Sequence, residues 1–184
     1  MKHENVLNRN VKRLRSIAND APLSFILGPC VLEDRAVAHE IAQMVVELSA
    51  SLGFTLIFKG SFDKANRGSL DGYRGRGMHE GLELLWEIRT QYQVPVTTDV
   101  HECWQVAPVA DVVDVIQIPA FLARQTDLLI AAGNTGKVIH VKKGQFMTAG
   151  QAGHAVHKIH QATGNKQVWL CERGYTFGYE NLVV

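Results

Sequence analysis

A basic, glycine-rich segment at residues 59–77 carries the densest group of chemically useful side chains in the sequence. It reads KGSFDKANRGSLDGYRGRG, in which basic side chains outnumber the two carboxylates, Asp63 and Asp71. Ammonium and guanidinium groups among hydroxyls and glycine backbone donors suit the oxygens of a phosphate or a carboxylate. The alternative is an ordinary solvated basic loop. The candidate anion-binding residues are Lys59, Ser61, Lys64, Asn66, Arg67, Ser69, Arg74 and Arg76.

Polar residues also stand where short apolar runs end. The carboxyl ends of parallel strands lie at one edge of a sheet or barrel, which is where such proteins place their ligands. Side chains alternate along a strand, so Thr97 shares a face with Asp99, and His140 with Lys142. The alternative is that strand ends simply emerge into water, but the excess of cations favours a site for more than one anionic group. These strand-end residues are Lys59, Asp99, Gln117, Lys142 and Arg173.

The elements that must position these residues alternate along the chain. Apolar, β-branched runs followed by longer helical patterns, at intervals of about 20–40 residues, predict βα units and a parallel sheet buried on both faces. We expect strands at Ser24–Leu27, Thr55–Lys59, Val94–Asp99, Val113–Ile118, Val138–Lys142 and Val168–Cys171. We expect helices at Ala36–Leu52, His79–Tyr92, Trp104–Ala110, Thr126–Ala132 and Gln151–Thr163.

Several other motifs do not support a function. GNTGKV (residues 133–138) lacks the spacing and the hydroxyl residue of a nucleotide-binding P-loop, and no strand leads into RGRGMHEG as a dinucleotide fingerprint requires. His154, His157 and His160 recur on one helix, where a solvated surface is favoured over a metal site. Cys103 and Cys171 are expected to be packing residues.

Composition places the chain among ordinary globular domains. Its 184 residues carry a net charge of +1 and are 46% hydrophobic, so any phosphate site must be local rather than a bulk basic surface. Three cysteines argue against a disulfide framework. Without an apolar leader or an apolar run of about 20 residues, a cytoplasmic location is expected.

Seven segments together resemble the 3-deoxy-D-manno-octulosonate 8-phosphate synthase family in order and spacing, across residues 23–184. They are GPCVLED, FKGSFDKANRGS, RGRGMHEGLELL, VPVTTDVHE, DVIQIPAFLARQTDLL, VKKGQF and LCERGYTFGYENLVV. The resemblance implies an α/β fold, the (β/α)8 TIM barrel, with about six βα units present in one partial domain, residues 1–184. It implies a transferase that condenses phosphoenolpyruvate with D-arabinose 5-phosphate and water, releasing phosphate, in lipopolysaccharide inner-core biosynthesis. The related 3-deoxy-D-arabino-heptulosonate 7-phosphate synthases share the barrel and the phosphoenolpyruvate chemistry but not these strings.

The same resemblance implies roles for individual residues. Asp99 would contact the sugar end or a catalytic water. The phosphate of arabinose 5-phosphate would be bound by Asn66, Arg67 and Ser69. Phosphoenolpyruvate would be bound by Lys59, Ser61, Lys64, Gln117, Ala120, Arg124, Lys142 and Arg173.

Cys30 in GPC marks the metal-dependent branch of this family and would be one ligand of a divalent metal ion. The alternative is a buried cysteine that packs as a small apolar group. The remaining ligands are expected beyond residue 184. The family also implies a homo-oligomer, a tetramer, and no nucleic-acid or membrane partner.

The chain departs from the family pattern in places. Gly68 stands where the family has serine, so no hydroxyl is supplied there, and His140 stands where it has asparagine. The family continues through two more strands, so we expect the 184-residue chain alone not to be a working synthase, because a barrel needs eight strands to close. The function expected is therefore that of the synthase itself. The alternatives are a catalytically inactive fragment or anion-binding remnant of such a synthase, or a related 3-deoxy-heptulosonate 7-phosphate synthase. A rival expectation for the fold is an open, doubly wound sheet.

Overall fold

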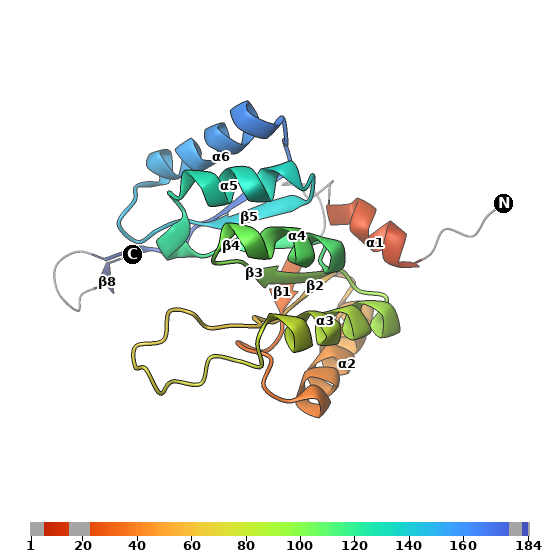
Figure 1. The fold of residues 1–184 in the computed structure, drawn as a ribbon. Helices are drawn as coiled ribbons and strands as arrows, with labels where there is room; N and C mark the ends of the chain where they lie inside the picture. Colours follow the sequence, from red (N-terminus) through yellow and green to blue (C-terminus); the bar gives the residue numbers. More distant parts are fainter. Residues whose placement is uncertain (1–5, 15–22, 177–181, 184) are drawn as a thin grey trace. The chain divides into compact units, whose positions relative to one another are not determined.

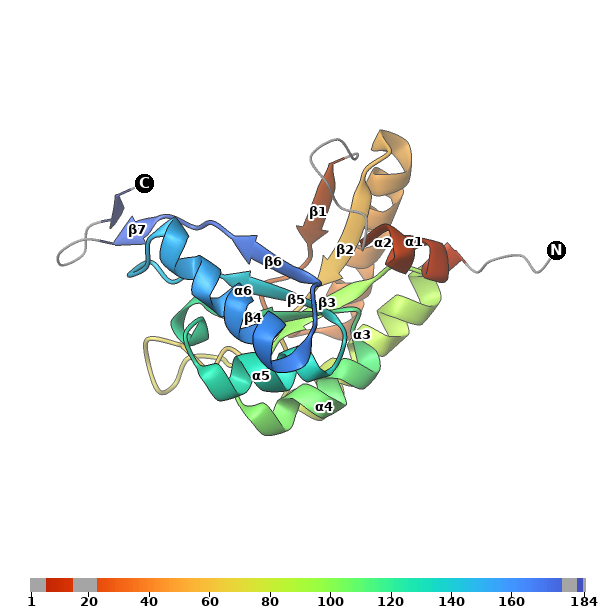
Figure 2. The ribbon, with the colours of Figure 1, turned by 90° about the horizontal axis from the view of Figure 1, so that it is seen from above.

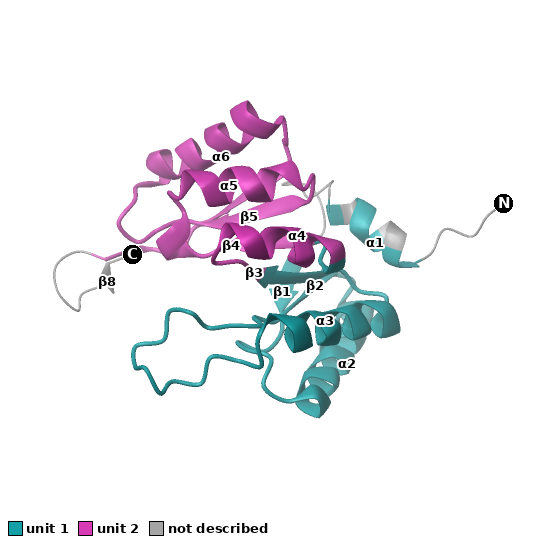
Figure 3. Ribbon diagram, viewed as in Figure 1, with its two compact units in different colours: residues 1–98, 112–114 teal, residues 99–111, 115–184 magenta. Residues whose placement is uncertain are grey.

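The computed structural model describes residues 6–14, 23–176 and 182–183. The chain forms two compact units, which Figure 3 shows in different colours. Unit 1 comprises residues 1–98 and 112–114, and unit 2 comprises residues 99–111 and 115–184. Each unit is built from βα repeats.

Unit 1 contains the first three strands of the chain, all parallel (Figure 1). Strand β1 pairs with β2 along its whole length, and β2 pairs with β3 at its carboxyl end. β2 is buried at its three central residues and β3 throughout, as expected for strands covered on both faces. The elements are α1 (Val6–Leu14), β1 (Ser24–Leu27), α2 (Arg35–Leu52), β2 (Thr55–Lys59), α3 (Met78–Tyr92) and β3 (Val96–Asp99).

Helix α2 has clear start and stop signals. The Asp34 side chain accepts a hydrogen bond from the backbone N–H of Val37, which satisfies one of the unpaired donors of the first turn. Gly53 ends the helix in the left-handed conformation, at φ 74°. Helix α2 is joined to α3 by an ion pair and hydrogen bond between Arg35 and Glu87, so the two helices are held side by side.

An ion pair to a buried carboxylate fixes the start of β3. The carboxylate of Asp114, whose side chain is 3% exposed, accepts two hydrogen bonds of 2.9 Å from the guanidinium of Arg89 on α3. It also accepts the backbone N–H of Val96 at 3.0 Å. Hydrogen bonding to Asp114 raises the pKa of Arg89. The pair therefore ties α3 to the strand that leads to Asp99.

Unit 2 repeats the pattern. Strands β4, β5 and β6 are parallel neighbours in sequence order, and α5 and α6 run side by side (Figure 2). Thr148 and Gln151 form a reciprocal capping box at the start of α6. The elements are α4 (Cys103–Val112), β4 (Val115–Ile118), the 3-10 helix η1 (Ala120–Leu122), α5 (Thr126–Asn134), β5 (Val138–Lys142), α6 (Ala149–Thr163), β6 (Val168–Cys171), and a short antiparallel pair, β7 (Tyr175–Thr176) and β8 (Leu182–Val183).

The expected fold class is confirmed. In each unit, consecutive strands are adjacent and parallel with a helix between them, which is the winding of a β/α barrel and not of a doubly wound sheet. All six expected strands are present, although β3 and β4 each begin two residues later than predicted. The five expected helices are also present, and four begin one or two residues earlier. The sequence reading missed α1, η1 and the β7–β8 pair.

No disulfide links the three cysteines, as expected. Cys103 was expected to pack in the interior, and this is wrong, because it is exposed at the first turn of α4. Cys171 is half-buried in β6. Across the described ranges, the helices are too short or too polar for any of them to cross a lipid bilayer.

Candidate active site

In unit 1, two lysines converge on one serine at the end of β2. The Nζ atoms of Lys59 and Lys64 donate to the Oγ of Ser61 at 2.9 and 3.0 Å. Ser61 is fully buried, and its backbone is fixed by the N–H of Leu32, which donates to its carbonyl at 3.0 Å. Two ammonium groups so close together repel each other, and an anion beside them relieves that repulsion. The arrangement can therefore bind a carboxylate or a phosphate.

A close backbone approach sets the position of Lys59. Gly28, which follows β1, lies so near β2 that a Cβ atom there would be 2.0 Å from the carbonyl oxygen of Lys59. Its φ of 153° also disfavours any other residue. Glycine at this position allows the ends of the two strands to meet.

Two of the basic residues of segment 59–77, Arg74 and Arg76, form ion pairs with protein carboxylates. Arg74 forms a two-pronged ion pair with Asp63, at 2.8 and 2.5 Å, which raises the pKa of Arg74. Arg76 donates to the carbonyl of Glu33 at 2.6 Å and pairs with Glu80 at 3.1 Å. Because both arginines already have protein partners, they are weaker candidates for binding an anion than the sequence predicts.

The residues expected to bind the sugar phosphate are exposed on the same segment. Arg67 donates through Nε to the carbonyl of Tyr73 at 2.9 Å, which orients its guanidinium. Asn66, Gly68 and Ser69 are also exposed. These positions are accessible to a ligand, and their role stays a prediction.

In unit 2, a buried carboxylate lies beside a histidine that the sequence reading did not single out. Asp99 ends β3, and its Oδ2 is 3.1 Å from Nε2 of His101, with the two side chains 9% and 13% exposed. The backbone of the next residue, Val100, donates to the carbonyl of Gln117 at 3.1 Å, which links this segment to β4. Gln117 is itself buried, at 5% exposure. The Asp-x-His spacing in TTDVHE is the signal that could have identified the pair.

Two further cations lie at the ends of β5 and β6. Lys142 lies directly opposite Cys171 in the pairing of β5 with β6. Arg173 comes two residues after Cys171. Lys142 is half-buried and Arg173 is exposed. Within the described ranges, neither side chain has a hydrogen bond or an ion pair to the protein. Both are therefore available to an anion.

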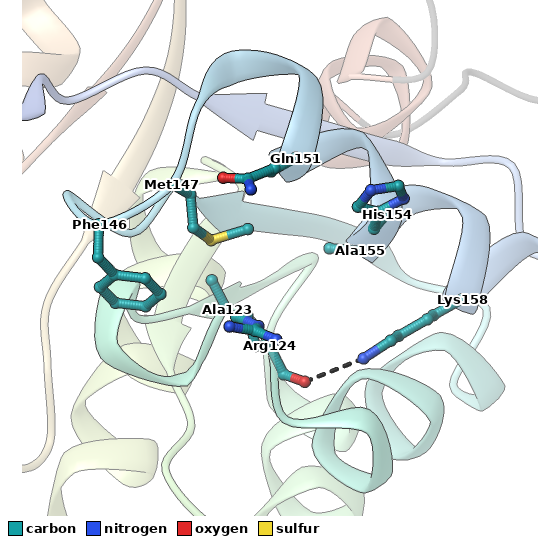
Figure 4. Close-up of a pocket in the computed structure, with 8 residues that line it drawn as sticks. All are labelled: Ala123, Arg124, Phe146, Met147, Gln151, His154, Ala155 and Lys158. Carbon is teal, nitrogen blue, oxygen red and sulfur yellow. Dashed lines mark hydrogen bonds between the residues drawn. The ribbon is translucent and has the colours of Figure 1, made fainter.

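Arg124 and Ala120 lie on the segment that follows β4. Ala120 begins η1, and the carbonyl of Arg124 accepts a hydrogen bond from Nζ of Lys158 at 3.1 Å. The Arg124 side chain helps to line a cavity of about 450 Å³ beside α6 (Figure 4). None of the other residues predicted to bind phosphoenolpyruvate lines this cavity. Its lining residues are Ala123, Arg124, Phe146, Met147, Gln151, His154, Ala155 and Lys158.

Cys30 is exposed, which argues against the alternative of a buried packing residue. It lines a cavity of about 280 Å³ with Glu33 and Asp34. In the part of the chain that the structure describes, no three His, Cys, Asp or Glu side chains are grouped to hold a metal ion. His154, His157 and His160 are therefore not part of such a group among the described residues. Because one thiolate is not a site, the residues described here do not by themselves fit a metal ion.

In each unit, parallel strands follow one another in sequence order with a helix between them, and this defines a protein of the β/α-barrel class. Comparison with known proteins narrows this class. Residues 8–183 match the DAHP synthetase I family, and the chain belongs to that family.

Individual relatives carry a more specific name than the family. The chain is 53% identical to the 2-dehydro-3-deoxyphosphooctonate aldolase of Shewanella pealeana over 168 residues, covering 91% of this chain and 59% of the relative. It is 54% identical to the protein of the same name from Shewanella amazonensis over 169 residues, with coverages of 92% and 60%. The relative from Mannheimia haemolytica is 54% identical over 168 residues, with coverages of 91% and 59%. The chain thus spans about three fifths of the length of these curated relatives.

Proposed function

We propose that the protein condenses phosphoenolpyruvate with D-arabinose 5-phosphate and water, giving 3-deoxy-D-manno-octulosonate 8-phosphate and inorganic phosphate. The observation that carries the proposal is the placement of Lys142 and Arg173 at adjacent strand ends, without protein counter-ions among the described residues, in a chain of this family. The names of the relatives support the choice of product, because 2-dehydro-3-deoxyphosphooctonate is this eight-carbon keto acid phosphate.

The cations divide between the two charged groups of phosphoenolpyruvate. Lys142, Arg173 and the backbone near Ala120 take its phosphate. The lysine pair on Ser61 takes its carboxylate, since the two ammonium groups already converge on one oxygen. Gln117 and Arg124 are proposed to bind the same substrate, as the family resemblance implies.

The sugar phosphate is bound by the exposed residues of segment 59–77. Arg67, Asn66 and Ser69 present charged and polar groups there, and Gly68 contributes only its backbone N–H. Asp99, held by His101, faces the aldehyde end of the sugar or the attacking water.

The chemistry follows from this arrangement. C3 of the enol attacks the aldehyde carbon, a new C–C bond forms, and the aldehyde oxygen takes up a proton. Water adds at C2, losing a proton, and the resulting tetrahedral centre breaks its bond to the phosphate oxygen to leave a ketone and inorganic phosphate. Fixed cations stabilise the charge that develops on the phosphate and carboxylate, and holding both substrates in register lowers the entropic barrier. In this proposal, the buried Asp99 carboxylate accepts a proton from the water.

A divalent metal ion belongs to the proposal as a cofactor of the whole protein. Cys30 would supply one thiolate ligand, and its exposure leaves the sulfur accessible. The other ligands are proposed to come from sequence beyond residue 184. Exhaustive dialysis against a chelator should then abolish activity of the completed protein, and retained activity would refute metal dependence.

The location and assembly of the protein follow from the same proposal. Both substrates are charged phosphate esters that do not cross membranes, so the enzyme is proposed to act in the cytoplasm, in lipopolysaccharide inner-core synthesis. Its proposed state is a homo-oligomer, a tetramer as in the family it resembles.

The test completes the barrel. The segment of the Shewanella amazonensis relative that follows its matched region is fused after Val184, and phosphate release is measured with both substrates and added divalent metal. We expect release that requires both substrates, with one octulosonate formed per phosphate. Lys142→Met in the same fusion controls for background hydrolysis. Binding of phosphoenolpyruvate with no condensation would instead favour an inactive anion-binding protein.

A further inference from the structure

A buried lysine lies directly after Lys142. The side chain of Lys143 is 2% exposed, and its Nζ donates to three backbone carbonyls: Gly174 at 2.8 Å, Met147 at 3.0 Å and Gly144 at 3.3 Å. An ammonium group has three donors, and here three carbonyl oxygens accept from them. Its nitrogen also lies 3.9 Å from the centre of the Tyr175 ring.

Such burial needs an explanation. Removing an ammonium group from water is costly, and lysine is almost never fully buried without partners. The carbonyls and the aromatic face compensate this cost. Because all three donors are engaged, Lys143 does not itself bind an anion.

The carbonyls belong to two separate segments. Gly144 and Met147 follow β5, whereas Gly174 follows β6. The backbone reinforces the link, since the N–H of Lys143 donates to the carbonyl of Cys171 at 2.9 Å. Lys143 thus ties together the loop that follows Lys142 and the loop that contains Arg173.

Arg173 lies between Glu172 and Gly174, which both take part in contacts with Lys143. The Oε1 atom of Glu172 accepts the backbone N–H groups of Arg173 and Gly174, both at 2.8 Å, and lies 3.3 Å from Nζ of Lys143. The hydrogen bond from Gly174, followed by that from Arg173 and by Lys143, lowers the pKa of Glu172. The residues on both sides of Arg173 are thereby fixed, and its own side chain is left to project from a defined backbone.

We propose that Lys143 is a positioning residue that sets the distance between Lys142 and Arg173, so that both can bind one phosphate group. The inference rests on the proposed function only in identifying that phosphate as the one of phosphoenolpyruvate. The link between the two loops through one buried ammonium group does not depend on the proposed function.

The test combines two measurements on the 184-residue chain carrying Lys143→Met. Hydrogen exchange reports on the loops, and we expect faster exchange at residues 144–147 and 172–176 with little change in α5. Calorimetric titration with phosphoenolpyruvate reports on the site, and we expect affinity to fall roughly tenfold or more, the size of effect typical for lost charge-assisted contacts. Lys143→Arg, which can still donate to carbonyls, should recover part of both properties.

A stability-matched control separates positioning from general loosening. Ile159→Val removes one methyl group from a fully buried side chain on α6, away from both loops. It should lower the melting temperature without changing phosphoenolpyruvate affinity. If Lys143→Met does not fold, Tyr175→Leu withdraws the aromatic face and leaves the Lys143 ammonium group with its carbonyl acceptors. It should give a smaller loss of affinity with the same pattern of exchange.

The outcomes distinguish the two proposals. If the unmodified chain binds no phosphoenolpyruvate, the proposed function fails, while faster exchange in Lys143→Met still supports the link between the loops. If Lys143→Met or Tyr175→Leu binds as tightly as the unmodified chain, or leaves exchange in both loops unchanged, the positioning role is overturned.

Discussion

At the scale of single residues, the proposed chemistry depends on which cations the protein leaves available. Arg74 and Arg76 are engaged by Asp63, Glu33 and Glu80. Lys142 and Arg173 have no such partner among the described residues. A positive charge with no protein counter-ion can bind an anionic ligand, so Lys142 and Arg173 are the stronger candidates for binding phosphate.

The two proposed substrates should respond to different residues. In the completed protein, Arg67→Ala should raise the KM for arabinose 5-phosphate more than the KM for phosphoenolpyruvate. Lys142→Ala should weaken phosphoenolpyruvate binding or lower kcat. Losing a charge-assisted contact costs about 1.5–3 kcal/mol, or roughly ten- to a hundredfold. Steady-state kinetics with each substrate varied in turn measures both effects, and equal effects of both changes on both substrates would contradict the assignment.

Residue identity alone predicted part of this site. The polar residues at strand ends were visible because each follows an apolar run. The engagement of Arg74 was not visible, because its partner Asp63 lies eleven positions away in the sequence and meets it only when the loop folds back. The burial of Lys143 was hidden for a similar reason, since its acceptors are backbone carbonyls, which every residue possesses.

At the scale of elements, the strand ends are set by backbone contacts that tolerate little change. Gly28→Ala would place a Cβ 2.0 Å from the carbonyl oxygen of Lys59, so the end of β2 has to move. We expect a loss of both stability and phosphoenolpyruvate affinity, measured by thermal unfolding and calorimetry. Gly53→Ala is the matched control, because its φ of 74° is also left-handed but nothing lies within 4 Å of its Cβ position. That change should cost only about 1 kcal/mol of stability and leave affinity intact. Unchanged affinity in Gly28→Ala would show that Lys59 does not need this approach.

The contact between α2 and α3 predicts a pH dependence. The hydrogen bond from Arg35 lowers the pKa of Glu87 from its ordinary 4.5, and His39 acts in the same direction. A lowered carboxyl pKa stabilises the fold above pH 4.5, and this stabilisation is lost as the pH falls through the lowered value. Because Glu87 is partly exposed, its contribution is below about 1 kcal/mol. Glu87→Gln should remove this part of the acid dependence in denaturant titrations, whereas Glu47→Gln on the exposed face of α2 should not. Parallel pH profiles for Glu87→Gln and the unmodified chain would contradict the assignment.

The helices and strands themselves were largely predictable, and the reasons are physical. Longer helical patterns between the apolar runs identified α2 and α6, and apolar, β-branched runs identified the strands. The sequence analysis did not predict α1, a short helix whose nine residues contain three basic and four apolar side chains. It missed β7 and β8 because a strand of two residues has no period to detect.

At the scale of the whole molecule, β1 and β6 are the first and last of the six parallel strands that the structure describes, and each has one paired neighbour. Among the described residues, β1 pairs only with β2, and β6 pairs only with β5. Their side chains are less buried than those of β3 and β4, and Leu170 on β6 is 44% exposed. Unpaired strand edges bearing apolar residues promote pairing with other chains.

We therefore expect the 184-residue chain to associate in a concentration-dependent way, measured by sedimentation velocity. Leu170→Lys places a charge on the β6 edge and should reduce this association. Leu70→Lys makes the same change at a loop position that is 97% exposed, and it should have no effect. A monomer at all concentrations would show that these edges are satisfied in solution.

The most direct test of the account is a calorimetric titration of the chain with phosphoenolpyruvate. Lys142 and Arg173, at the carboxyl ends of β5 and β6, are proposed to hold its phosphate, so the unmodified chain should bind it. Lys142→Ala and Arg173→Ala should each weaken binding by roughly tenfold or more. Lys137→Ala, which removes the lysine just before the amino end of β5, should leave the affinity unchanged. Absence of binding, or equal weakening by all three changes, would contradict the claim that these strand ends form a phosphoenolpyruvate site.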